Sequence, residues 1–284
     1  LPKDSTEVPD ETLFRLSEER GLNPEMVISI ANLSGWTDLG IRVGFAADMA
    51  SRNAERTKAA AKERSRTHIF SSTAFPHTSM DYYSDTSRTA FEATVLGCDS
   101  LSESQLISLK LSNEVTKTPT HYVVLDRTLF YPEGGGQLGD QGSLGDAIVV
   151  DTRAENGIIY HLTDGSLPVG EISGVVSWER RRQLMDHHTA VHVVGGSARA
   201  LLGPHIWQAG SNKGARYARI DLTHHSRLSR DDLNHIEDYS NEVIAANIAV
   251  EKLVMSRAEA DEAYGFELYQ GGPPKNSEIR VIRI

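Results

Sequence analysis

Cysteine is almost absent from this chain: Cys98 is the only one in 284 residues. An internal disulfide framework is therefore excluded, and the chain fits a reducing compartment such as the cytoplasm. No apolar run approaches the roughly 18 residues that span a bilayer, and we see no basic-then-apolar leader, so neither membrane contact nor secretion is expected. Basic residues are also scarce, with 29 Lys and Arg against 39 Asp and Glu and a formal net charge of −10. Such a surface does not coat nucleic acid indiscriminately, so any RNA contact requires a local basic patch or shape.

The composition is that of a folded protein. Hydrophobic residues make up 39% and charged residues 24%, which allows a core to be buried and excludes wholesale disorder. The length favours about two domains. Because the sequence starts at Leu1 and ends in the strand-like stretch before Ile284, we expect both ends to be cuts through a longer protein.

Residues 1–84 are predicted to be a helical segment and linker. One helix ends before Gly21, a second begins at Pro24, and an Ala-, Arg- and Lys-rich stretch predicts a third from 45 to about 66. Residues 85–178 contain short strands punctuated by glycine and almost no helix, which is typical of a small β-barrel.

Residues 179–284 show a mixed pattern. A long helix is expected from 179 to 202, followed by a strand over 215–222 and by further alternating helices and strands. This mixture predicts an α+β sandwich, so the overall fold class is α+β. Two local signals support the assignment: Asn156-Gly157 predicts a hairpin, and Ser229 followed by Asp232 predicts a capped helix start.

The most informative local pattern is His188-Thr-Ala-Val-His192. Residues four apart on a helix share a face, so both imidazoles can reach one metal ion. Thr189 replaces the glutamate that a zinc protease carries after its first histidine, so that protease base is missing. The alternative is a pair of surface or core histidines, because a zinc site needs three or four protein ligands.

A second pattern is the glycine triplet that ends the stretch from Asp126 to Gln137. Gly134, Gly135 and Gly136 permit positive φ angles and close approach of the backbone to a ligand. Backbone N–H groups in such a loop can bind an anion or a developing oxyanion. The alternative is a tight hairpin with no ligand.

The third pattern is Gln208-Ala-Gly-Ser211. The Gln208 amide can donate or accept a hydrogen bond near a bound substrate, although Gln before Ala-Gly is also common in simple turns.

Taken in order, these motifs resemble the editing region of alanyl-tRNA synthetases of the archaeal type and the related free-standing AlaX-type deacylases. The resemblance rests on four stretches of the sequence: FYPEGGGQLGDQG, LMDHHTAVHVV, QAGSNKGARYARIDLTHHSRLS and AYGFELYQGGPPKNSEIRVIRI. It covers nearly the whole chain and is strongest from Phe91 onward.

The resemblance implies hydrolysis of the ester of tRNA(Ala) wrongly charged with serine or glycine. It also implies a zinc ion held by His188 and His192 together with a Cys and a His from a later CxxxH motif, which this chain does not contain. Cys98 has no His four positions on and is a poor substitute. The implied partners are the tRNA(Ala) acceptor end and the rest of the synthetase chain. ATP and Mg²⁺ would serve only the aminoacylation part, which joins alanine to tRNA(Ala) and is absent here.

Individual roles carry over as expectations. Thr128 resembles the residue that recognises the serine hydroxyl, and Gln208 resembles the glutamine that orients substrate or water. The substrate-binding set expected at the pocket floor and its basic rim is Gly134, Gly135, Gly136, Gln137, Arg181 and Lys213. Arg180, Arg182, Arg216 and Arg219 extend the basic patch that could meet phosphates, although charge runs are also common on solvated faces.

Two other interpretations stay open. The chain could be a free-standing deacylase that edits in trans, or a tRNA-docking fragment without catalysis. The helical N-terminal segment favours editing within a longer synthetase over both of these alternatives.

Overall fold

The computed structural model describes residues 6–20, 24–36, 39–42, 45, 48, 52, 69–70, 75–224, 226–264 and 277–284. Most of the predicted helix from 45 to 66, and the 265–276 part of the fourth stretch, lie outside the described residues. The chain divides into two compact units, one with residues 1–64, 192–209 and 220–284 and the other with residues 65–191 and 210–219. The division into 1–84, 85–178 and 179–284 remains a prediction from sequence.

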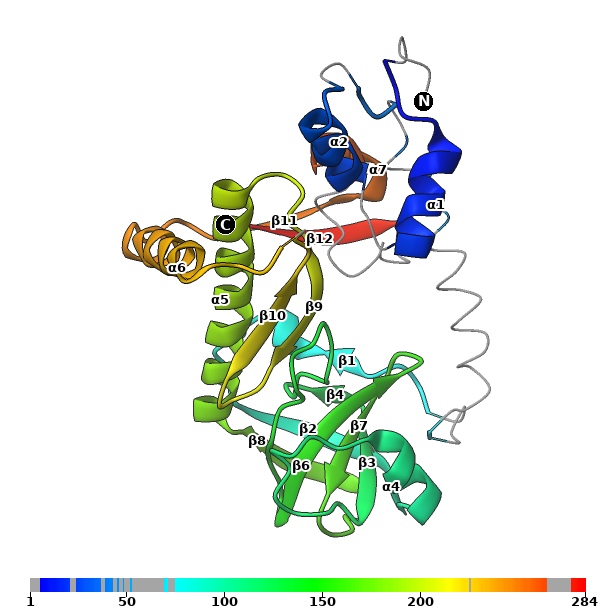
Figure 1. Ribbon diagram of the computed structural model, residues 1–284. Helices are drawn as coiled ribbons and strands as arrows, with labels where there is room; N and C mark the ends of the chain where they lie inside the picture. The colour runs from blue at the N-terminus through cyan, green and yellow to red at the C-terminus, as the bar shows by residue number, and fades with distance from the viewer. Residues whose placement is uncertain are drawn as a thin grey trace. The chain divides into compact units, whose positions relative to one another are not determined.

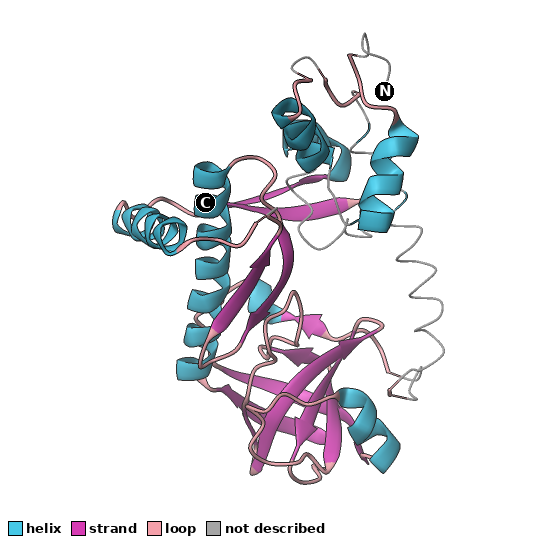
Figure 2. Cartoon of the chain, viewed as in Figure 1, coloured by secondary structure: helices cyan, strands magenta, loops and turns pink. Residues whose placement is uncertain are grey.

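The second unit is built on a six-stranded antiparallel sheet (Figure 1). Its strands are β2 (Ala90–Ser100), β3 (His121–Leu125), β5 (Gly142–Leu144), β6 (Ala147–Glu155), β7 (Ile158–Thr163) and β8 (Gly170–Val176). They pair in the order β2-β3-β7-β6-β5-β8, and β8 pairs in turn with β2, which closes the sheet into a barrel. The mixed helix and strand content expected from the sequence is confirmed (Figure 2).

Turn chemistry fixes the register of this sheet. Asn156 and Gly157 have φ angles of 53° and 79°, as a two-residue hairpin between β6 and β7 requires, so the predicted hairpin is confirmed. The β2–β3 ladder shifts register between Val95 and Gly97. A Cβ atom at Gly97 would lie 2.3 Å from the Phe75 ring, so only glycine allows the ring to pack there.

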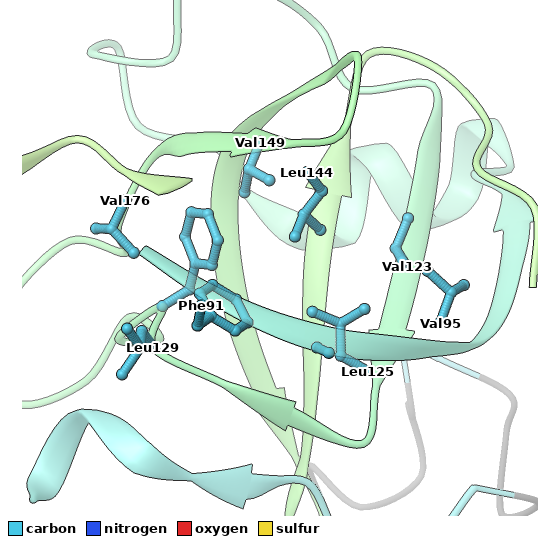
Figure 3. Packing of buried hydrophobic residues seen from close by; sticks show 10 residues of the cluster. Phe91, Val95, Val123, Leu125, Leu129, Leu144, Val149 and Val176 are labelled. Carbon is cyan, nitrogen blue, oxygen red and sulfur yellow. The ribbon is translucent and has the colours of Figure 1, made fainter. Parts of the chain in front are cut away.

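The interior of the barrel is apolar (Figure 3). Phe91, Val95, Val123, Leu125 and Leu144 are each at most 6% exposed and belong to one cluster. Burial of such a side chain contributes about 1.5–3 kcal/mol, so this cluster is the main source of stability for the unit.

One helix in this region was not predicted. α4 (Glu103–Leu109) begins with a capping box in which Ser102 and Gln105 exchange hydrogen bonds. Its Leu109 joins a second cluster with Tyr122 and Tyr160 outside the first one. This short helix is the only one that the structure shows among the described residues 85–176, and its Ser-x-x-Gln signal was available in the sequence.

Short elements carry the candidate site. β1 (Ser79–Met80), followed by the 3₁₀ turn η1 (Asp81–Tyr83), pairs in parallel with β4 (Arg127–Thr128), and β9 (Gln208–Lys213) pairs with β10 (Ala218–Leu222). The predicted long helix is α5 (Trp178–Leu202), which begins one residue before the expected start at 179.

The first unit contains the remaining elements: α1 (Asp10–Arg20), α2 (Pro24–Leu33), α6 (Arg230–Ala245), β11 (Glu251–Ser256), α7 (Arg257–Tyr264) and β12 (Glu278–Arg283). The capped start of α6 at Ser229 and Asp232 is confirmed. β11 and β12 form an antiparallel pair whose inner face packs on Ala260 of α7. Within the described part of the chain, no helix has the length and apolar character needed to cross a membrane.

Candidate functional site at the glycine turn

The glycine triplet forms a tight turn in the second unit. Gly134 and Gln137 exchange two backbone hydrogen bonds of 3.0 Å, and the residues between them, Gly135 and Gly136, have φ angles of 59° and 79°. A Cβ atom at Gly136 would lie 2.6 Å from the carbonyl oxygen of Ser211. Glycine is therefore required at this position both by conformation and by space.

The turn is attached to the end of β9. The Lys213 backbone N–H donates to the Gly136 carbonyl at 2.7 Å, and the Leu138 N–H donates to the Lys213 carbonyl at 3.2 Å. Gly135 and Gly136 are themselves exposed, while Gln137 is buried. The turn is thus a surface feature with a fixed base.

His188 of α5 reaches this turn. Its Nδ1 lies 2.8 Å from the side-chain oxygen Oε1 of Gln137, and Gly135 is near its Cε1 atom. Since an amide oxygen only accepts, His188 Nδ1 carries the proton and Nε2 carries the lone pair. An imidazole held in this way is suited to bind a metal ion or accept a proton.

Lys213 lies underneath the turn. Its side chain is 1% exposed, and Nζ donates to the Gly135 carbonyl at 2.6 Å and to Ser211 Oγ at 2.7 Å. Burial lowers the pKa of this ammonium group, because the charged form loses its hydration. The expected phosphate contact by Lys213 does not fit this enclosure.

Thr128 lies at the end of β4 and is fully buried. Its hydroxyl oxygen accepts the Phe130 N–H at 3.0 Å and lies 2.8 Å from Nε2 of His161. His161 Nδ1 lies 3.1 Å from the Val123 carbonyl, which can only accept, so Nε2 accepts the Thr128 hydroxyl proton. The hydroxyl expected to recognise serine thus gives its one proton to His161 inside the barrel and has none to offer a ligand.

His161 is a buried histidine that the sequence did not single out. Complete burial lowers its pKa to about 4, so the ring is neutral at physiological pH. Only its position inside the strand β7, which is buried along its whole length, could have pointed to it.

The three consecutive arginines of the basic patch, Arg180, Arg181 and Arg182, each form an ion pair. Arg181 is 3% exposed and donates through Nε to Asp140 at 2.8 Å, with further bonds to the Leu129 and Thr86 carbonyls. Arg180 pairs with Glu114 at 2.9 Å. The expected phosphate contact by Arg181 therefore does not fit, because its guanidinium group is enclosed and paired.

Glu114 was also missed from sequence. Besides pairing with Arg180, it accepts the backbone N–H groups of Ala215 and Arg216 at 3.0 and 3.3 Å, which ties down the loop after β9. Burial acts to raise its pKa, but these hydrogen bonds and Arg180 outweigh burial and lower it.

His192 and Gln208 belong to the other compact unit, and their roles as metal ligand and substrate-orienting residue remain predictions from sequence. Both are partly buried. Among the described residues, no group of three or more His, Cys, Asp or Glu side chains could hold a metal ion. His188 and His192, one helical turn apart, therefore supply at most half of a tetrahedral zinc site within the described chain.

Comparison with known proteins places the chain in a class. A family model described as tRNA synthetases class II (A) matches residues 1–180, and the chain belongs to this family. Alanine–tRNA ligase of Methanopyrus kandleri is 37% identical over 290 residues, covering 98% of this chain and 29% of the relative. Alanine–tRNA ligase of Haloquadratum walsbyi is 38% identical over 283 residues, covering 98% and 28%. The chain thus spans less than a third of the length of these relatives.

Proposed function

We propose that the chain is the editing region of an alanine–tRNA ligase and hydrolyses the ester of Ser-tRNA(Ala) or Gly-tRNA(Ala). The whole protein would attach alanine to tRNA(Ala) with ATP and Mg²⁺ in its aminoacylation part. The three-part arrangement of helical segment, small barrel and α+β editing core belongs to this proposal. Cytoplasmic location and contact with the acceptor end of tRNA(Ala) are likewise part of it.

The observation that carries the proposal is the meeting, within one compact unit, of the glycine turn with the first histidine of the HxxxH motif. The exposed glycine turn and the HxxxH helix meet at the hydrogen bond between Gln137 and His188. Two motifs about 50 residues apart in sequence have no packing requirement to meet through a polar pair, so a shared chemical task is the simpler account.

The chemistry asked of such a site is modest. Water attacks the carbonyl carbon of the aminoacyl ester, the bond to the terminal ribose oxygen breaks, and the free amino acid and tRNA leave. An aminoacyl ester is already reactive, so positioning supplies much of the acceleration. The N–H groups of the exposed turn at Gly135 and Gly136 would face the ester, and His188 would be kept in one tautomer by Gln137.

We also propose that His188 and His192 are two of the ligands of a zinc ion. When bound in such a site, zinc polarises a carbonyl group or lowers the pKa of water. His188 and His192 would be the chain's ligands to such an ion, and the roles argued here for His188 and the glycine turn concern the chain's own atoms.

A deacylation assay tests the proposal. The chain is incubated with tRNA(Ala) carrying radiolabelled serine, glycine or alanine, and release of each amino acid is followed. We expect faster release of serine and glycine than of alanine. Equal spontaneous release from all three, with and without the chain, would contradict an editing function.

A second candidate is a tRNA-docking fragment without catalysis. Binding of uncharged tRNA(Ala) with no effect on any ester would support this candidate over editing.

A further inference from the structure

Lys213 poses an energetic question. Its side chain is almost completely enclosed, and neither of the hydrogen-bond acceptors that the structure gives its ammonium group is a carboxylate. Its two acceptors, the Gly135 carbonyl and the Ser211 hydroxyl, are both neutral. Burying an unpaired cation is costly, and a methionine would fill a similar volume without that cost. We therefore expect that the lysine is present because its N–H groups form hydrogen bonds that a methionine cannot form.

The contacts of Lys213 identify that task. The side chain holds the Gly135 carbonyl from below, and the backbone N–H of the same residue holds the Gly136 carbonyl. Both central residues of the turn are thus fixed by one residue of β9. Glycines at positive φ have wide conformational freedom, so without these bonds the turn would sample other conformations.

The position of the glycine turn determines where Gln137 lies. Gln137 closes the turn through its two backbone bonds to Gly134, and its side-chain oxygen accepts the proton on His188 Nδ1. A continuous series of hydrogen bonds and one tight turn therefore leads from Lys213 to the His188 ring. A displacement of Gly135 would move Gln137 away from His188.

We propose that Lys213 is a positioning residue: by fixing the Gly135 carbonyl it places Gln137 against His188 and so sets the tautomer of that histidine. The inference rests on the proposed function for its catalytic consequence. Its structural part concerns only the turn and the histidine ring, and can be measured without any substrate.

The test compares Lys213→Met with Lys117→Met. Lys117 is a matched control, because it lies in the same unit but makes an exposed ion pair with Asp164 at 2.5 Å. ¹⁵N NMR of the histidine rings reports which nitrogen of His188 carries the proton. We expect Nδ1–H in the wild type and in Lys117→Met, and a mixture of Nδ1–H and Nε2–H in Lys213→Met. A folded Lys213→Met variant with an unchanged His188 tautomer would overturn the proposal.

A second variant guards against misfolding of the first. Lys213→Gln keeps a polar group in the buried site, but its side chain is too short to reach the Gly135 carbonyl, so the same tautomer mixture is expected. An unchanged tautomer in a folded Lys213→Gln variant would equally overturn the inference.

Kinetics separate positioning from substrate binding. With Ser-tRNA(Ala), Lys213→Met should lower kcat by about ten- to hundredfold with little change in KM, because a displaced catalytic geometry slows the chemical step. If the wild type hydrolyses no ester, the proposed function fails, while the tautomer measurement still decides the role of Lys213. A tautomer change without any change in kcat would overturn the catalytic part of the inference.

Discussion

Gln137 Oε1 accepts the Nδ1–H of His188 at 2.8 Å, and this bond joins the glycine turn to the α5 helix. The two residues come from separate motifs, and neither needs the other for local structure. The bond fixes the histidine in the tautomer whose Nε2 carries the lone pair.

Replacing Gln137 tests the importance of this bond. Gln137→Ala should lower the rate of Ser-tRNA(Ala) hydrolysis by about ten- to hundredfold, because the histidine loses its fixed tautomer and orientation. Gln141→Ala is the matched control, since Gln141 donates to the Val150 carbonyl at 2.9 Å inside the same unit. If both variants lose activity equally, the effect is one of stability and not of the His188 contact.

The steric requirement at the turn gives a second prediction. Gly136→Ala places a Cβ atom against the Ser211 carbonyl at a positive φ angle, so the free energy of unfolding should fall by about 1–3 kcal/mol. Gly165→Ala is the control, because no atom lies within 4 Å of its added Cβ. Chemical denaturation of both variants measures the difference, and equal stabilities would contradict the described turn.

Replacing Thr128 tests whether this residue stabilises the barrel or recognises the substrate. Thr128→Val leaves His161 Nε2 without its donor inside the barrel, so the free energy of unfolding should fall by about 1–3 kcal/mol. The ratio of Ser-tRNA(Ala) to Ala-tRNA(Ala) hydrolysis should stay the same. A changed ratio at unaltered stability would return Thr128 to the substrate pocket.

The buried His161 predicts a pH dependence of stability. Its pKa falls from 6.5 to about 4 on folding, so the unfolded state binds a proton that the folded state refuses. The contribution is fully present above pH 6.5 and is lost as the pH falls toward 4, by about 3 kcal/mol in total. Denaturation across this range should show the loss in the wild type and a smaller loss in His161→Gln. Parallel curves for the two proteins would contradict the neutral, buried histidine.

Zinc binding tests the two-histidine proposal. Zinc uptake, measured by calorimetry on a form extended through a later CxxxH motif, should be lost in His188→Ala and in His192→Ala, because each variant removes one of the four proposed ligands. His121→Ala is the control, since His121 belongs to β3 and lies outside the turn and α5. Equal uptake by all four proteins would reject the assignment.

Local signals in the sequence predicted local structure well. The Asn156-Gly157 hairpin, the α6 cap and the α5 helix each depend on neighbours within a few residues, and all three are confirmed. The α4 helix was missed although its capping box was visible in the sequence.

Burial was harder to predict, because it depends on contacts between distant residues. From the sequence, Lys213 and Arg181 were expected to be exposed cations. In the structure both are buried by contacts with distant residues: Asp140 is 41 positions from Arg181, and Gly135 is 78 positions from Lys213. Thr128 looked like a ligand-facing hydroxyl, and its partner His161 is 33 positions distant. Motif order pointed to the turn and the helix that the Gln137–His188 hydrogen bond joins, whereas the burial and partners of each side chain required the fold.

The most direct test of the central claim is to locate the bound ester. A non-hydrolysable 3′-seryl-amide analogue of the terminal adenosine is titrated into ¹⁵N-labelled chain, and backbone amide shifts are followed. We predict the largest shifts at Gly135, Gly136 and Gln137, together with a change at the His188 ring. Saturable binding with shifts confined to residues outside the turn and α5 would contradict the account.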